Sequence, residues 1–398
     1  MPMLNADEFA LALPPADEAL EDLAFELATA VTGLAVQLNP VLRASVADLM
    51  RRVNCYYSHQ LAGHELEPLD IESAVAGQLS STSRRRRQQL AAVAHIELQR
   101  SIDIGADPPA NPTSASYLEW LYCGLGRRQP DVAAAGSHVL APDAGARDQQ
   151  PPASEERCGL SDSTPRECAA VLQQFEAAYD VQGRLRGVMA AGAAYQRLLR
   201  IRPFFEGNGR IGRLMAYALL TRLGLRPSLW PLARGLARQR DEYDVHLRAA
   251  GMGARAAEAA EPLSSQLIVR FCRFFLSVCL EQVRYQESVL AVDHLLQRIQ
   301  LFCAQETAGS RLPSGAFPLL RELVLHGEVE RHRVSSFVGS GPAESRTWAA
   351  QHLTAALLNR GLIVADAPRA PFRLGLSAHV VDRWFPALYP ALSTQSTG

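Results

Sequence analysis

One short segment, Ile201 to Arg213, holds the residues of this sequence that are best suited to chemistry. It reads IRPFFEGNGRIGR and centres on the turn Gly207-Asn208-Gly209, whose residue types tolerate a positive φ. Apolar residues follow at helical spacing, so we expect a buried helix to begin near Asn208. A glycine-rich turn that opens a helix points backbone N–H groups outward at the positive end of the helix dipole. The segment therefore predicts an anion site.

The charged residues of this segment indicate which anion it could hold. Arg210 and Arg213 are three residues apart and share one helix face. Cations at a helix start are disfavoured by roughly 0.3–1 kcal/mol each, so we infer that they face an anion and could hold a polyphosphate. Glu206 could hold a magnesium ion that bridges the phosphates. In the alternative interpretation, both arginines pair with acidic side chains and Gly207 only makes a turn.

Helical periodicity dominates the elements that must position this segment, so the fold class is expected to be mainly α. The pattern predicts helices within 16–79, over 84–104, 117–125, 165–179, 185–199, 211–223 and 238–250, and one long helix over 264–302. Residues 127–164 are rich in Pro, Ala, Ser, Gly and Asp, and we expect them to form a long loop.

The C-terminal part shows a different pattern. Three expected helices, 317–325, 330–337 and 345–360, precede a two-stranded ribbon formed by 361–364 and 372–374. This order is typical of a winged helix. We accordingly divide the chain into an N-terminal helical region (1–104), a central domain (105–302) and a winged helix-turn-helix-like domain (303–398).

Composition excludes several classes of function. The 398 residues are 48% apolar, enough for a full core, and the net charge of −1 gives no general attraction to nucleic acid or acidic lipid. No segment approaches the roughly 18 apolar residues of a membrane span, and Met1 to Pro14 does not resemble a secretory signal. The seven cysteines are scattered without a CxxC pair, which favours reduced, buried thiols in a cytoplasmic protein.

The segment at 201–213 resembles the core motif of the Fic family, H-P-F-x-[DE]-G-N-G-R-x-x-R. It matches that motif at every position except the first, where Arg202 replaces the histidine. The resemblance implies a Fic-type helical core that binds ATP or another nucleotide together with Mg²⁺. Its implied phosphate-binding residues are Gly207, Asn208, Gly209, Arg210 and, for the terminal phosphate, Arg213, while Glu206 would hold the metal and Phe204 would pack under the loop.

Fic proteins transfer AMP or related groups from a nucleotide to hydroxyls of target proteins, and the motif histidine is their general base. Arg202 cannot take that role, because a guanidinium keeps its proton up to about pH 12. Loss of a positioned base lowers the rate by ~10²–10⁴. The resemblance therefore implies a relative of the adenylyltransferases that is impaired in ordinary AMP transfer.

A second segment, Asn54 to His64, resembles the inhibitory helix of many Fic proteins, S-x-x-x-E-[GN]. Ser58 and Gly63 match, but Ala62 replaces the glutamate whose ion pair would turn Arg213 away from the phosphate. We therefore expect nothing to restrain Arg213.

Two other regions bear on the resemblance. The target-docking hairpin of the family falls within 127–164, where no alternating strand is evident. The segment 228–238 and the C-terminal domain resemble multidomain bacterial Fic proteins.

Four functions remain open. The chain is a nucleotide-binding pseudoenzyme or regulator, or a transferase that uses Arg202 to position an anionic acceptor. Alternatively, it transfers AMP with a base from elsewhere, such as Tyr195 or a histidine on another segment, or it is a DNA-binding regulator. The presumed recognition helix offers DNA few polar side chains: Arg346, Gln351, Asn359 and Arg360. The expected partners are the nucleotide, an unknown protein or small-molecule acceptor and a second copy in a homodimer, with nucleic acid weakly supported and no membrane.

Three histidines and two cysteines are interpreted as structural residues. His59, His64 and His95 lie on apolar helical faces, and we interpret them as core residues with satisfied hydrogen bonds rather than as ligands. Cys272 and Cys279 lie seven residues apart on a helix rich in Phe, which indicates core packing.

Overall fold

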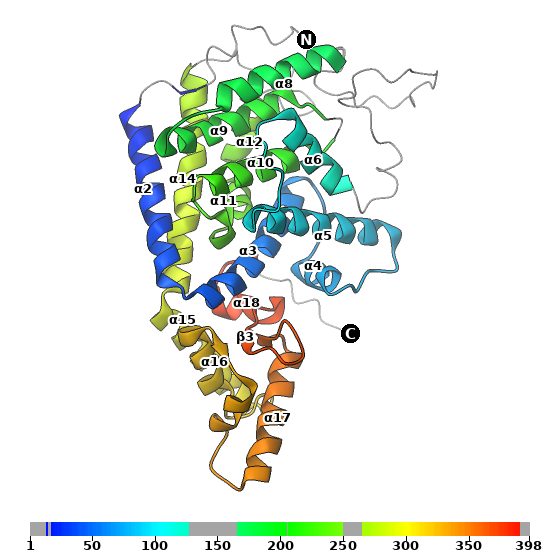
Figure 1. Ribbon diagram of the computed structural model, residues 1–398, viewed down its shortest axis with the longest axis vertical. Helices are drawn as coiled ribbons and strands as arrows, with labels where there is room; N and C mark the ends of the chain where they lie inside the picture. Colours follow the sequence, from blue (N-terminus) through cyan, green and yellow to red (C-terminus); the bar gives the residue numbers. More distant parts are fainter. Residues whose placement is uncertain (1–12, 15–16, 127–164, 205, 250–264, 391–398) are drawn as a thin grey trace.

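The computed structural model describes residues 13–14, 17–126, 165–204, 206–249 and 265–390, and these are mainly helical (Figure 1). The expected mainly α class is confirmed, whereas the loop expected at 127–164 lies outside the described residues. The helices that surround the motif are α2 (Glu18–Gln37), α3 (Pro40–Leu61), α4 (Pro68–Val75), α5 (Ser83–Asp103), α6 (Ala115–Gly126), α8 (Pro165–Tyr179), α9 (Arg184–Ile201), α10 (Asn208–Arg222), η1 (Pro227–Leu229), α11 (Leu232–Arg238), α12 (Arg240–Ala249) and α14 (Ser265–Leu290).

The motif segment lies at the centre of this helical body. Helices α2 and α14 pack side by side along one edge, and α14 also packs on α9 (Figure 1). Helix α9 packs in turn on α10, so the connection between these two helices is held by the core on both sides. The chain between Ile201 and Asn208 therefore has a fixed path.

Helix α3 is the other central element, because it contacts α5, α10, α11 and η1. Its start is fixed by Asn39, whose side chain accepts a hydrogen bond from the Leu42 N–H at 2.8 Å, and by a proline at the first helical position. Along its second half, polar residues such as Asn54 and Ser58 are buried among apolar ones. Buried polar groups require partners on neighbouring elements, and α3 finds them on the motif helix and on α11.

One expected helix is corrected. The single helix expected over 264–302 is wrong, since α14 ends at Leu290 and α15 (Val292–Ala308) begins after Ala291, whose extended ψ of 117° interrupts the helix. Apolar spacing continues across this break, so periodicity alone does not reveal it. The helix expected over 238–250 is confirmed as α12, which α11 precedes.

The remaining C-terminal elements are α16 (Ala316–His326), β1 (Glu328–Val329), η2 (Arg331–Ser336), α17 (Ala343–Asn359), β2 (Ile363–Val364), β3 (Phe372–Leu374) and α18 (Ala378–Trp384). The strands form an antiparallel sheet in the order β1-β3-β2. The ribbon therefore has a third strand, too short for alternation to be recognised in the sequence. The helix expected at 330–337 is the 3₁₀ segment η2, and the winged-helix assignment stays a prediction.

Backbone carbonyls of the C-terminal segment accept hydrogen bonds from side chains of the helical body. The carbonyl of Leu388 accepts hydrogen bonds from Tyr57 Oη at 2.9 Å and from Arg234 Nε at 3.2 Å. Arg52 donates to the carbonyl of Leu376 at 2.9 Å. Because Arg234 is only 2% exposed, this junction belongs to the interior of the protein. None of the described helices has both the length and the apolar character needed to cross a bilayer.

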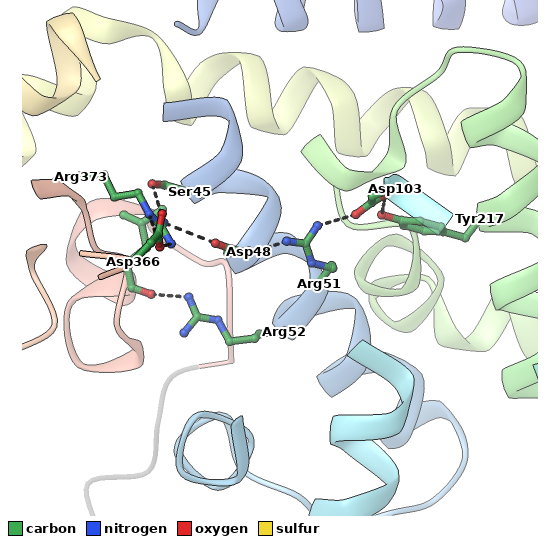
Figure 2. A network of polar contacts seen from close by, with 9 residues as sticks. Ser45, Asp48, Arg51, Arg52, Asp103, Tyr217, Asp366 and Arg373 are labelled. Carbon is green, nitrogen blue, oxygen red and sulfur yellow. Dashed lines mark hydrogen bonds and ion pairs between the residues drawn. The ribbon is translucent and has the colours of Figure 1, made fainter. Parts of the chain in front are cut away.

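A chain of charged groups joins the motif helix to the C-terminal sheet (Figure 2). Tyr217 of α10 donates a 2.6 Å hydrogen bond to Asp103, whose carboxylate also pairs with Arg51 of α3. Arg51 pairs with Asp48, which lies 3.4 Å from Arg373 of β3. Burial raises the pKa of Asp103, and Arg51 opposes that shift. The carboxylate therefore depends on its partners to remain ionised.

We expect Arg51→Met to lower the free energy of unfolding by about 3–5 kcal/mol, because it leaves the Asp103 carboxylate buried without its cation. The side chains of this pair are only 8% and 10% exposed. Arg284→Met is the matched control, since Arg284 and Glu26 are 60% and 48% exposed and such pairs contribute about 0–1 kcal/mol. Urea unfolding followed by circular dichroism measures both. Equal losses in the two variants would contradict the structural importance of Arg51.

Candidate anion-binding site

The connection between α9 and α10 reverses the chain through two left-handed residues. Arg202 caps α9 with φ 50° and ψ 61°, and its N–H donates to the Leu198 carbonyl at 2.9 Å. Gly207 precedes α10 with φ 77°. The left-handed region is open to glycine but disfavoured for other residues by roughly 1–2 kcal/mol. The half-buried Arg202 is thus held by its surroundings in a conformation that arginine does not favour.

Asn208 closes the turn. Its Oδ1 accepts a hydrogen bond from the Phe204 N–H at 3.0 Å, and its Nδ2 donates to the Phe204 carbonyl at 2.6 Å. Phe204 is 1% exposed and stacks on Tyr122 with ring centroids 4.6 Å apart, which confirms that it packs under the loop. Because both ends of its amide are engaged, Asn208 shapes the turn, and its backbone N–H is the group left to face an anion.

The arginine side chains lie against this glycine turn. A Cβ atom at Gly207 would be 3.6 Å from Nη2 of Arg210, and one at Gly209 would be 3.4 Å from Nη1 of Arg213. The first N–H groups of α10 have no acceptor within the helix. The turn therefore combines free helical N–H groups with two guanidiniums at van der Waals distance, the arrangement that binds phosphate groups.

Arg213 is restrained, contrary to the expectation from the sequence. It is 6% exposed, and it donates from Nε to the Ser58 hydroxyl and from Nη2 to the Ser58 carbonyl, both at 2.8 Å. Ala62, which replaces the family's glutamate, is exposed at the end of α3. The expectation was wrong because it considered only a charged partner, whereas a hydroxyl and a carbonyl on the same helix satisfy the guanidinium.

Arg210, unlike Arg213, has a buried guanidinium nitrogen without a hydrogen-bond partner. Its Nη1 atom is buried and has no hydrogen-bond partner, and burial lowers its pKa while Glu206 opposes that shift. Within the described chain, neither Arg210 nor Arg213 forms an ion pair with a carboxylate, which contradicts the interpretation that both pair with acidic side chains.

Glu206 is exposed at the edge of the turn. The residues that the structure describes contain no group of three acidic, histidine or cysteine side chains able to hold a metal. A lone carboxylate nevertheless suits Mg²⁺ when phosphate oxygens and water supply the other ligands. Glu206 fits the metal as a partner of a bound polyphosphate, and not as a site by itself.

Tyr195 is unsuitable as a replacement base, and that alternative is corrected. Its side chain is fully buried and its hydroxyl is hydrogen-bonded to Tyr243. Burial raises the pKa of Tyr195 well above its usual value, and the neighbouring tyrosine adds to the shift. A phenol that retains its proton so firmly cannot accept another from a substrate hydroxyl at physiological pH.

The histidines that were interpreted as satisfied core residues are instead gathered beside the arginines. The ring of His59 is 5.2 Å from that of His64 and 6.0 Å from that of His95. His59 and His95 are buried, but both ring nitrogens of His59 and Nδ1 of His95 lack hydrogen-bond partners. The signal in the sequence was that His59 directly follows Ser58, a residue that matches the family's inhibitory-helix motif.

Curated relatives match 91 residues of the chain. The chain is 34% identical over 91 residues to "Protein adenylyltransferase Fic" of Drosophila yakuba, a match that covers 22% of this chain and 17% of the relative. The relative of the same name from Drosophila melanogaster is also 34% identical, over 22% of this chain and 18% of its own length. The chain thus matches less than a fifth of the length of these relatives.

Two solved structures are similar over more of the chain. A Fic family protein from Desulfovibrio desulfuricans G20 aligns with a TM-score of 0.46 and 16% identity, covering 90% of this chain and 97% of the other. A Fic domain containing signaling protein from Bacteroides thetaiotaomicron VPI-5482 aligns with a TM-score of 0.43 and 17% identity, covering 66% and 95%.

The family comparison agrees with the motif. The model of the Fic/DOC family matches residues 132–220, a range that includes the connection between α9 and α10 and most of the motif helix. The glycine turn, the buried Phe204, Arg210 and Arg213 all lie within the matched range. The chain therefore contains a domain of the Fic/DOC family.

Proposed function

We propose that the chain binds a nucleotide or an inorganic polyphosphate, together with Mg²⁺, at the turn between α9 and α10. The observation that carries this proposal is the position of the Arg210 and Arg213 guanidiniums against Gly207 and Gly209 at the start of a helix. Phosphate oxygens would accept hydrogen bonds from the first backbone N–H groups of α10 and from both arginines. Glu206 would contribute a carboxylate oxygen to the metal.

We further propose that ordinary AMP transfer to a hydroxyl is impaired in this protein. Arg202 stands where the family's base would be, and a guanidinium does not accept a proton at physiological pH. Tyr195 is buried and hydrogen-bonded to another tyrosine. The family domain and the 34% identity to adenylyltransferases over 91 residues support the nucleotide as ligand, while the residue at position 202 supports loss of the transfer step.

Binding of a nucleotide does not require Arg213 to give up its partners on α3. Its two hydrogen bonds to Ser58 occupy Nε and Nη2, whereas Nη1 lies nearest the glycine turn. A phosphate at the turn can therefore be contacted by Nη1 without breaking the contact with α3. Ser58 then acts as a support that holds the guanidinium in place.

Arg213→Ala should weaken binding of magnesium-ATP at least about tenfold, or about 1.4 kcal/mol, because it removes a charge-assisted contact to phosphate. Isothermal titration calorimetry measures the affinity. Arg222→Ala is the control, since Arg222 lies at the other end of α10 and pairs with Asp107 at 3.0 Å. Absence of binding at millimolar nucleotide, or the same affinity in Arg213→Ala and wild type, would remove the proposed site.

Ser58→Ala should lower the free energy of unfolding by about 1–3 kcal/mol, because Nε of the buried Arg213 loses its acceptor. Saturating magnesium-ATP should recover part of the loss by giving the guanidinium a phosphate partner. The control is Ser45→Ala on the same helix, a residue 3% exposed whose hydroxyl lies 3.4 Å from Arg373. Thermal unfolding with and without ligand measures both variants, and a loss no greater than that of the control would argue against the support role.

Arg202→His should increase labelling of protein hydroxyls with AMP by about 10²–10⁴ over a wild type that labels them poorly, because it restores a general base. Histidine is also more common than arginine at positive φ, so the backbone can accommodate it. Radiolabelled ATP measures the transfer.

The control for this experiment is Arg202→Asn, since asparagine tolerates the left-handed backbone but cannot act as a base. Efficient labelling by the wild type would refute the impairment. Pyrophosphate release by the wild type that depends on a carboxylate or phosphorylated compound would instead indicate a transferase for anionic acceptors.

A further inference from the structure

Three histidines, of which His59 and His95 are buried, form a cluster at the junction of α3, α5 and α10. His59 belongs to the last turn of α3, His64 lies three residues after the end of that helix, and His95 belongs to α5. His59 has no exposed surface and His95 is 2% exposed. The ring centroid of His59 is 5.2 Å from that of His64 and 6.0 Å from that of His95. The three rings are therefore neighbours within one small volume.

Several polar atoms in this volume have no hydrogen-bond partner. They are Nδ1 and Nε2 of His59, Nδ1 of His64, Nδ1 of His95 and Nη1 of Arg210. A neutral imidazole carries one donor and one acceptor, and an imidazolium carries two donors. Buried polar atoms are usually paired. These unpaired nitrogen atoms therefore remain able to form hydrogen bonds, and the neighbouring arginine favours a negatively charged partner.

The charged groups that face the cluster are cationic. Helix α10 contributes Arg210 and Arg213, whose positive charges act on His59 and His95. The titratable groups next to these arginines are uncharged. They are the buried Cys55 thiol of α3, which keeps its proton because burial raises its pKa, and the Tyr195 phenol of α9, which interacts with Arg213.

The carboxylate that follows His64 in the sequence is directed elsewhere. Glu65, next to His64, is 88% exposed and lies 3.7 Å from Arg84. Within the described residues, no carboxylate forms an ion pair with any of the three histidines. The cluster is therefore exposed to the positive charge of two arginines of α10, and no carboxylate in the described part of the chain pairs with it.

All three imidazoles are neutral near pH 7 in this state. Burial, with added repulsion from Arg210, lowers the pKa of His59 well below its usual value and lowers that of His64. Burial, with repulsion from Arg213 and Arg210, lowers the pKa of His95 to about 3. An anion that neutralises the two arginines would remove their repulsion of a protonated histidine.

We propose that His59, His64 and His95 adjoin the anion site and take up protons when a polyphosphate binds at the turn. The proposal rests on the proposed function, since it requires an anion at Gly207 to Arg210. A bound polyphosphate offsets the charge of Arg210 and Arg213 and attracts an imidazolium. The proton comes from the buffer and adds to an unpaired ring nitrogen, with no other bond formed or broken.

The direction of the pH dependence follows from this coupling. The anion raises the pKa of the histidines in the complex above their values in the free protein, so the complex holds more protons. Affinity therefore increases as the pH falls toward the pKa of the free histidines, and the gain disappears at a pH above the pKa of the bound state. Multiply charged ligands should show the effect most strongly, because they neutralise both arginines.

The test is calorimetric titration of the full chain with magnesium-ATP at about pH 6.5, in several buffers that differ in enthalpy of ionisation. The dependence of the binding heat on the buffer gives the number of protons taken up. We expect about 0.3–1 proton for each nucleotide bound, which corresponds to about a twofold to tenfold tighter Kd for each unit fall in pH. Binding heat that is the same in every buffer would overturn the proton coupling and leave the nucleotide site standing. No binding in any buffer would overturn both.

Substitution of single histidines tests whether the cluster takes up the protons. His95→Gln should reduce the proton uptake while nucleotide binding remains, whereas His352→Gln, at an exposed histidine of α17, should leave it unchanged. Comparison with the wild type also removes the contribution of protons bound by the nucleotide itself. Because His95 is buried, circular dichroism and thermal unfolding first establish that the variant is folded. Uptake that is the same in wild type and in folded His95→Gln, His59→Gln and His64→Gln would refute the role of the cluster.

Discussion

A buried guanidinium must find hydrogen-bond acceptors, and in this protein Arg213 of the motif helix finds them on helix α3. The Ser58 hydroxyl and carbonyl accept from Nε and Nη2 at 2.8 Å. This pair of contacts fixes α3 against α10 and thereby places His59 next to the proposed anion site. Both acceptors are neutral, so Arg213 is positioned while its positive charge stays available to an anion.

The turn between α9 and α10 places a second constraint on the site. Left-handed residues at Arg202 and Gly207 set the path of the chain, and Asn208 holds it closed through the backbone of Phe204. Glycine meets the requirement at position 207 without strain, whereas arginine at position 202 does not. Packing around the half-buried Arg202 must compensate, which is why exchange of this residue is expected to change chemistry more than fold.

A hydrogen bond and a series of ion pairs also connect the motif helix to the C-terminal sheet. Tyr217 lies on the motif helix, and its hydrogen bond to Asp103 begins a series of ion pairs that reaches Arg373 through Arg51 and Asp48 (Figure 2). Buried ion pairs are costly to break because each partner would remain desolvated. The motif helix and the sheet therefore share part of their stability, although they are far apart in the sequence.

The sequence by itself determined the mainly helical class, most helices around the motif and the glycine turn at Gly207. These features depend on neighbouring residues, through periodicity and through the φ angles that each residue type tolerates. The packing of Phe204 was expected only from the resemblance to the Fic family. Only the tertiary structure decided which groups pair with the buried polar atoms. It gave Arg213 to Ser58, engaged Tyr195 with Tyr243, and gathered the histidines of two helices beside the arginines, because the partner of a buried group depends on which elements pack together and not on local sequence.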